Sequence, residues 1–389
     1  MYKAYFDIPT VLLYISVGVL GYLCIRQFMK PCFPNSRVQF AMYKRRNRTF
    51  EMTFILLYTM LAVCRLVSID IGGSDAIDYV ENFKNIFTGG LDRKNNAELE
   101  IGFQYFTKII RSITDSYKVY FFVIYGFISW GYVTFIKKNC SKGLCYIPFI
   151  LLMYPFLKSF TSIRSSIAVG IILVGLTQID KRKWLSLILI LSSLLFHRMS
   201  VLFVLIWPFY FVMKGFLKIN SRMRFILVTL AGVVVSFVAA TMVQQYVFIM
   251  GLFDDSTTNH YLMASMGQNI FSRFPMFFGQ LMLWAAVVVL FNKIKWDEKS
   301  VLLRTLFVYD IWMIPVGLVL GMWRSIEYFY AVRLSLWCLC IFSFTRKQSK
   351  GFAAIVKALA ALLFVFWLFF RVYKEWDDAK LSPYFFDLL

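Results

Sequence analysis

The chain has 389 residues, of which 60% are hydrophobic and 16% charged, and its formal net charge is +21. Average soluble domains are about 45–50% apolar and about 25% charged, so this composition excludes an ordinary soluble protein. The basic residues gather in short loops between apolar runs, which is typical of membrane proteins rather than of nucleic-acid binders. We therefore expect an all-α, polytopic integral membrane protein, with residues 1–389 forming a single membrane domain, and no nucleic-acid partner.

Apolar runs long enough to cross a bilayer predict about eleven spans plus a re-entrant helical hairpin. The first run, residues 8–28, precedes a loop rich in arginine and lysine, which places this loop in the cytoplasm and the N-terminus outside. The second run, residues 50–69, leads to the main external loop, residues 70–118. The later spans are predicted at residues 119–136, 144–160, 164–181, 225–243, 274–292, 301–323, 328–344 and 352–370.

A second external loop is predicted at residues 254–273. Two features distinguish the main external loop, residues 70–118, and the first is its high content of aspartate and glutamate. Within residues 102–113, apolar side chains recur at helical spacing, which predicts a helix lying on or dipping into the membrane interface. These apolar residues are Phe103, Phe106, Ile109, Ile110 and Ile113.

Residues 184–213 form an apolar run that is interrupted once, at His197 and Arg198. Basic clusters flank both ends of this run, so a single span would place one cluster outside. Two half-helices folded at residues 197–200 would keep both clusters inside, which favours a re-entrant hairpin. Backbone breaks at membrane depth only where protein or a wet cavity receives it, so His197 and Arg198 are expected beside a cavity near the outer face.

Charged side chains at membrane level are candidates for function, because a charge inside a bilayer costs at least ~2.5–3.5 kcal/mol. In the predicted topology, several of them gather at the outer ends of the spans. Arginine offers planar, bidentate donors to phosphate, so this gathering suits a lipid-linked phosphate. The residues concerned are Arg65, Asp75, Asp78, Glu100, Lys158, Arg164, His197, Arg198, Arg273, Arg324, Glu327 and Arg333.

Several of these residues also have structural interpretations. Arg164 could be an ordinary interfacial side chain, and His197 could be a structural histidine. Arg333 could form a buried ion pair with Glu327 or another carboxylate. Asp310 is expected to pair with Arg304 or to meet a neighbouring loop, and no function is assigned to it.

The sequence gives no reason to expect a metal or a cofactor. It has no HExxH or CxxC motif and only two histidines. Asp75 and Asp78 could hold a divalent cation near a pyrophosphate, but nothing requires it.

Several short motifs, taken in order, resemble those of the EpsG/Wzy family of bacterial polysaccharide polymerases. Asp75-x-x-Asp78-Tyr79 follows the second span, and Glu100 to Phe103 resembles a Glu-Pro-Gly-Phe motif in which Ile101 replaces proline. The other elements are Arg164-Ser-Ser-Ile-Ala, Phe196-His-Arg-Met-Ser, the segment RSIEYF from Arg324, and Pro383-Tyr384. The resemblance covers about residues 50–385.

The resemblance implies a metal-independent, inverting glycosyltransferase without cofactors. It would polymerise O-antigen, capsule or exopolysaccharide repeat units carried on undecaprenyl pyrophosphate, at the outer face of the bacterial cytoplasmic membrane. The lipid-linked donor and acceptor would be its substrates in the bilayer, with a chain-length regulator and a flippase as candidate partners. An O-antigen ligase, a lipid-linked oligosaccharide flippase and a membrane acyltransferase stay open as alternatives.

On this interpretation, the charged and aromatic candidates divide into two groups. The proton acceptor is His197 or a carboxylate, Glu100 or Asp75. The arginines bind the pyrophosphate and offset the charge on the leaving group. We assign substrate binding to Arg164, Arg324, Arg198, Asp78, Tyr79, Tyr328 and Arg333.

Overall fold

The computed structural model describes residues 5–28, 36–87, 99–139, 153–218, 221–250, 274–320, 327–376 and 378–387. In these residues the chain is helical, and its one β contact is an isolated antiparallel bridge between Arg65 and Phe386. Seven helices of the described chain are long and apolar enough to cross a membrane, and three shorter apolar helices accompany them. The prediction of an all-α polytopic membrane bundle is confirmed.

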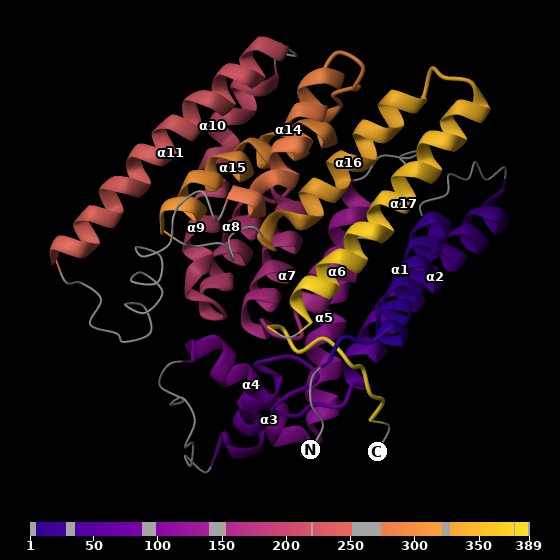
Figure 1. Ribbon diagram of the computed structural model, residues 1–389, viewed down its shortest axis with the longest axis vertical. Coiled ribbons are helices and arrows are strands. Elements are labelled where there is room, and N and C mark those ends of the chain that lie inside the picture. The colour runs from indigo at the N-terminus through magenta and orange to yellow at the C-terminus, as the bar shows by residue number, and fades with distance from the viewer. Residues whose placement is uncertain are drawn as a thin grey trace. The chain divides into compact units, whose positions relative to one another are not determined.

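The chain divides into two compact units, Met1–Leu205 with Ser349–Leu389 and Ile206–Gln348, whose helices are labelled in Figure 1. The helices of unit 1 are α1 (Ile8–Phe28), α2 (Arg37–Val63), α3 (Ala76–Asn85), α4 (Ile101–Ile113), α5 (Tyr117–Asn139), α6 (Met153–Lys158), α7 (Ile163–Gln178), α8 (Lys183–Ser192), η3 (Ser193–Leu195), η4 (Arg198–Ser200), α9 (Val201–Val204) and α17 (Lys350–Glu375). Those of unit 2 are α10 (Ile206–Lys218), α11 (Arg222–Met250), η5 (Phe274–Phe277), α14 (Phe278–Leu290), α15 (Glu298–Leu320) and α16 (Tyr330–Thr345).

In unit 1, helices α1, α2, α5, α7 and α8 pack in this order, each against the next. The close contact between α5 and α7 depends on glycine: a Cβ added to Gly131 would lie 2.9 Å from the Cα of Gly170. Tyr125 of α5 lies beside Phe160, just before α7, so the two helices run in the same direction. Their N-terminal ends therefore lie at the same end of unit 1.

That end of unit 1 is tied together by the C-terminal segment, residues 378–387. The backbone N–H of Leu66 donates to the carbonyl of Phe385 at 2.8 Å, and that of Gly72 donates to the carbonyl of Lys380 at 3.0 Å. The segment thereby holds the loop that leads into α3. Figure 1 shows α3 and α4 at this end of unit 1.

Arg65 fixes the point where α2 ends. Its Nε donates to the carbonyl of Gly72 at 2.7 Å, its Nη1 to that of Ala62 at 2.5 Å, and its Nη2 to the Tyr125 hydroxyl at 2.7 Å. The guanidinium carbon lies 4.1 Å from the centroid of the Phe160 ring. Arg65 is almost fully buried, and it joins the end of α2, the loop before α3 and the N-terminal half of α5.

The predicted break at His197 is confirmed. His197 has an extended backbone, with φ −158° and ψ 115°, between η3 and η4. The chain reverses there, because α9 packs back against α8. The limb before the break is a short apolar helix, residues 183–195, whereas Arg198–Leu217 is long enough to cross a membrane. The second limb is therefore longer than the half-helix that was predicted, and re-entrancy stays a prediction.

Two predicted boundaries also change. The second span was expected at residues 50–69, but α2 runs from Arg37 to Val63. It begins early because the Ser36 side chain caps it by accepting from the N–H of Gln39, and its arginines and lysines favour helix. The external loop contains α3 in addition to the predicted helix, α4. All of the region predicted at 254–273, and parts of those predicted at 70–118, 144–160 and 301–323, lie outside the described residues.

Unit 2 is built around α15, which packs against α10, α11 and α16. The Trp312 indole N–H donates to the carbonyl of Val228 at 3.2 Å. Gly232 of α11 faces the same ring so closely that a Cβ there would overlap it. In the middle of this unit, Asp310 of α15 pairs with Arg333 of α16.

Candidate functional site

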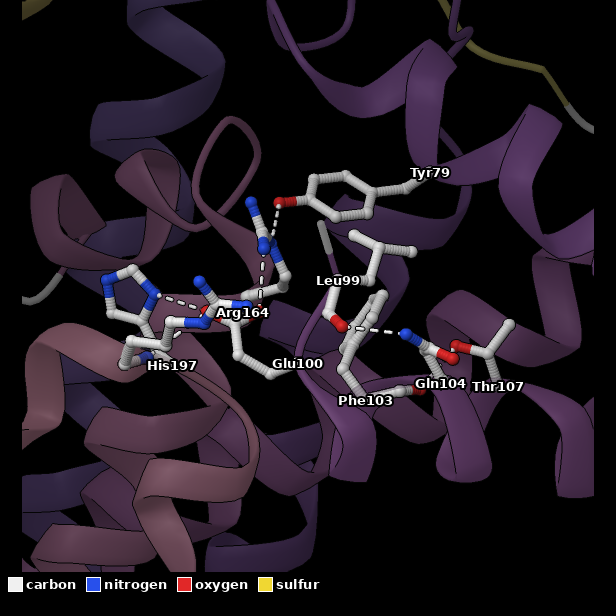
Figure 2. Close-up of polar contacts among 9 residues, drawn as sticks. Tyr79, Leu99, Glu100, Phe103, Gln104, Thr107, Arg164 and His197 are labelled. Atoms are coloured by element: carbon white, nitrogen blue, oxygen red, sulfur yellow. Dashed lines mark hydrogen bonds and ion pairs between the residues drawn. The ribbon is translucent and has the colours of Figure 1, made fainter. Parts of the chain in front are cut away.

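Four segments that are distant in sequence bring polar side chains together in unit 1 (Figure 2). Glu100 is the residue before α4, Arg164 lies in the first turn of α7, and His197 forms the break before η4. Tyr79 reaches the same place from α3. Each residue stands at or near a helix end, where side chains can converge without interrupting a helix.

An ion pair between Glu100 and Arg164 is the centre of this cluster. Arg164 Nη1 lies 2.6 Å from Glu100 Oε2, and Arg164 Nε donates to the Tyr79 hydroxyl at 3.3 Å. Glu100 is 7% exposed and Arg164 is 29% exposed. Among the described residues, Nη2 of Arg164 has no hydrogen-bond acceptor, so one edge of this guanidinium can bind a further anion.

The second oxygen of Glu100 meets the break around His197. Glu100 Oε1 accepts from the backbone N–H of Arg198 at 3.1 Å, and so caps the turn that begins there. The same oxygen lies 3.4 Å from His197 Nδ1, which is long for a hydrogen bond. Nε2 of His197 is buried and makes no hydrogen bond within the described chain. If Nδ1 carries the proton toward Glu100, Nε2 presents a lone pair.

The Glu100 carboxyl is held ionised. Burial alone would raise its pKa, but the contact with His197 and the charge of Arg164 outweigh burial and lower the pKa to about 2. Of these two neighbours Arg164 is the firmer, because its contact is shorter by 0.8 Å, 2.6 against 3.4 Å. Glu100 is therefore a permanent anion at neutral pH and a weak base.

The other candidates of unit 1 stand beside this cluster. Arg198 is exposed, and its guanidinium makes no hydrogen bond in the described residues. Asp75 immediately precedes α3 and accepts from the Ser74 hydroxyl at 3.3 Å. Asp78 lies in the first turn of α3 and is half-buried. Asp75 is one helical turn before Tyr79, and no direct contact joins either aspartate to Glu100.

The remaining candidates belong to unit 2 or lie outside the described residues. Arg324 lies outside the described residues, and Tyr328 is buried in the turn that precedes α16. Arg333 is paired with Asp310, with Nε to Oδ2 and Nη2 to Oδ1 both at 2.6 Å. This is the buried ion pair that was one interpretation of Arg333, with Asp310 as the carboxylate.

The expectation that Asp310 pairs with Arg304 or a loop is wrong. Asp310 Oδ1 also accepts from the Gln280 amide at 2.8 Å, so α14, α15 and α16 all contribute to one buried network. Sequence reasoning missed Gln280 and gave Asp310 no role. The signal available was an aspartate and an arginine standing in separate apolar spans, each of which needs a partner.

Within the described chain, no three side chains of histidine, cysteine, aspartate or glutamate come close enough together to hold a metal ion. The Glu100 cluster of unit 1 supplies a fixed carboxylate, a histidine beside it and guanidinium groups. Such a set can accept a proton at one atom and neutralise a negative group at another.

The family of this chain follows from comparison with known proteins. The sequence matches the profile of the EpsG family over residues 49–386, which is most of the chain. Neither a search of curated proteins nor one of solved structures gave a match. The matched region contains all the residues of the Glu100 cluster. The chain therefore belongs to the EpsG family, a family of Wzy-type, polymerase-like membrane proteins.

Proposed function

We propose that this protein is an inverting glycosyltransferase that polymerises oligosaccharide repeat units carried on undecaprenyl pyrophosphate, at the outer face of the bacterial cytoplasmic membrane. Membership of the EpsG family supports the polymerase reaction. The observation that carries the proposal is the cluster around Glu100, where a guanidinium edge and a histidine nitrogen that have no partners in the described part of the chain lie on either side of one carboxylate.

The reaction is a single displacement at the anomeric carbon of the growing chain. The acceptor hydroxyl oxygen forms the new glycosidic bond, and the bond from that carbon to the lipid pyrophosphate breaks with its electron pair on the phosphate oxygen. The hydroxyl proton passes to a base on the protein. Because a single displacement inverts the configuration, no covalent sugar–protein intermediate is needed.

His197 is the better of the candidate bases. Glu100 has a pKa of about 2, and both of its oxygens are already engaged. Its place beside His197 Nδ1 suits a different role, which is to orient the imidazole and to stabilise the imidazolium that forms. His197 Nε2 then accepts the proton. Because Nε2 is buried, a hydroxyl reaches it only after the residues around it shift.

Arg164 and Arg198 act on the leaving group. Arg164 is held by Glu100 and Tyr79 through Nη1 and Nε, so its Nη2 edge is presented in a fixed direction. Arg198 adds an exposed guanidinium next to His197. Pyrophosphate leaves readily when its charge is neutralised, so these cations take the place of a general acid. Arg324, Asp78 and Tyr328 stay candidates for binding the substrates, and Asp75 stays a candidate base.

The test is the glycan profile of a strain that lacks the gene, run as a gel ladder and complemented with the wild-type gene. Collapse of the ladder to a single repeat unit is the result expected of a missing polymerase. Long, unattached polymer on undecaprenyl pyrophosphate would instead indicate a ligase. Repeat units trapped on the cytoplasmic side would indicate a flippase, and the assignments of His197 and Arg164 would then fall.

A further inference from the structure

Helix α4, which begins directly after Glu100, has an exposed apolar edge. Ile101, Tyr105, Ile109 and Ile113 follow one another at intervals of four residues and are exposed by 58%, 60%, 60% and 78%. Side chains spaced in this way lie along one side of a helix, and the edge runs for roughly 18 Å. The apolar spacing from which this helix was predicted included Phe103 and Ile110, but both are buried in the protein.

The circumference of α4 divides into three surfaces. The first, which includes Phe103, Thr107 and Ile110, is buried against α3, α5 and η3. The second is the apolar edge. The third, polar surface carries Gln104, Lys108 and Arg111. A helix with one side on protein, one apolar side and one basic side fits the boundary between lipid and water.

The apolar edge continues an apolar surface of the neighbouring helix. Gly102 packs directly on Leu195, since a Cβ on Gly102 would lie 2.5 Å from that of Leu195. Leu195 is itself exposed, as are Leu191, Ile188 and Trp184 along the same side of α8. Helix α8 with η3 is one of the short apolar helices of this membrane protein, and its exposed side is suited to lipid. The edge of α4 therefore joins a lipid-facing surface at its Glu100 end.

We propose that phospholipid covers the edge formed by Ile101, Tyr105, Ile109 and Ile113, so that α4 lies in the headgroup layer and holds Glu100, Arg164 and His197 at the level of the lipid phosphates. This proposal rests on the proposed function and deepens it, because a lipid-linked pyrophosphate presents its phosphates at that level.

Two other occupants fit less well. A second copy of the chain would need about 800 Å² of surface on each side, which four side chains in a single row do not supply. The polyprenyl chain of a substrate is apolar enough, but it would cover the edge only while substrate is bound. The continuity with α8 indicates a permanent apolar neighbour instead.

The lipid contact can be tested without any assay of polymerisation. The full chain, carrying the photo-crosslinking residue p-benzoylphenylalanine at Ile109, is placed in vesicles of phosphatidylethanolamine and phosphatidylglycerol, irradiated and weighed by mass spectrometry. The matched control carries the same residue at Lys108, which is adjacent in sequence but turned about 100° around the helix. We expect phospholipid adducts at position 109 and few at position 108.

Equal yields at the two positions, or adducts within protein alone at position 109, would overturn the proposal. So would an adduct that forms only when a polyprenyl-linked oligosaccharide is added. Because this readout needs no activity, it stands even if the protein proves to be a ligase or a flippase.

The effect on the site is tested with Ile109→Gln and Lys108→Gln, which place the same side chain on different surfaces of α4. We expect Ile109→Gln to lower chain extension several-fold at unchanged protein level, and Lys108→Gln to leave it near wild type. Ile109→Gln with a wild-type ladder would overturn the claim that this edge sets the level of Glu100, even where the lipid contact itself is observed.

Discussion

Two of the arginine–carboxylate pairs in the described residues, one in each unit, have the same length but differ in what surrounds them. In unit 1, Arg164 meets Glu100 through one nitrogen at 2.6 Å, is 29% exposed and has no acceptor for its Nη2 nitrogen among the described residues. In unit 2, Arg333 meets both oxygens of Asp310 at 2.6 Å, and the Asp310 side chain is fully buried. The first pair is open to a ligand, whereas the second is closed.

The comparison teaches that a charge within an apolar chain does not by itself mark a binding site. A bidentate pair whose members come from two helices, with Gln280 from a third, satisfies itself and fixes how those helices pack. An ion pair that leaves donors exposed, beside a histidine nitrogen with no hydrogen-bond partner in the described residues, can bind a substrate. Variants of each pair should therefore fail in different ways, one in activity and the other in stability.

The largest effect is expected from His197→Ala. Loss of a general base lowers the rate about 100- to 10,000-fold, so polymer should collapse to single repeat units. The measurement is chain extension by purified protein in vesicles, with the thermal midpoint of unfolding as the control. His197→Asn can still approach Glu100 but lacks the acceptor at Nε2, and it should remain inactive. Activity restored by asparagine would make His197 a structural residue.

A stability effect of similar size is expected at the closed pair. Arg333→Met leaves the carboxylate of Asp310 buried without its cation, which costs about 3–5 kcal/mol. The double variant Arg333→Met with Asp310→Leu removes both charges and should recover most of this loss. Reversible unfolding in mixed micelles measures both. If Arg333→Met is as stable as wild type, the structural role of the pair is wrong. If the single and the double variant lose the same free energy of unfolding, the pairing is wrong.

Much of the fold could be predicted because hydrophobic length and periodicity act locally. The break at His197 was predicted from the basic clusters on both sides of residues 184–213, since charge placement constrains topology. The extent of α2 was not, because its end depends on Arg65 reaching Gly72 and Tyr125, which are distant in sequence. Helix α3 was missed because its ten residues lie within a polar loop.

The candidate site divides in the same way. The residue types of the site could be predicted, because arginine, glutamate and histidine at membrane level cost free energy and are therefore candidates for function. Which of them meet could not, since Glu100, Arg164 and His197 are joined only by the packing of α4, α7 and η4. For the same reason Asp310 was given the wrong partner. The partner of a buried charge is set by tertiary contacts.

The open pair should also make stability depend on acidity, with a somewhat smaller effect. The pKa of Glu100 is about 2 in the folded protein against an ordinary value of 4.5, so its ionised form stabilises the fold fully above about pH 4.5. This contribution, about 3 kcal/mol, is lost as the pH falls from about 4.5 through 2. The free energy of unfolding, measured from pH 6 to pH 2, should fall more steeply for wild type than for Glu100→Gln. Identical slopes would contradict the ion pair.

The smallest effect is expected from Arg164→Lys, which separates charge from geometry. Lysine keeps the positive charge near Glu100 but cannot hold Glu100, Tyr79 and a phosphate oxygen on three edges of one planar group. Losing one charge-assisted hydrogen bond to the pyrophosphate costs roughly 1.5–3 kcal/mol, or about 10- to 100-fold in rate. Arg182→Lys, at an exposed position, is the matched control. If Arg164→Lys gives ladders of wild-type length, recognition of the leaving group by Nη2 of Arg164 is wrong, and Arg164 then serves to hold Glu100 in place beside His197.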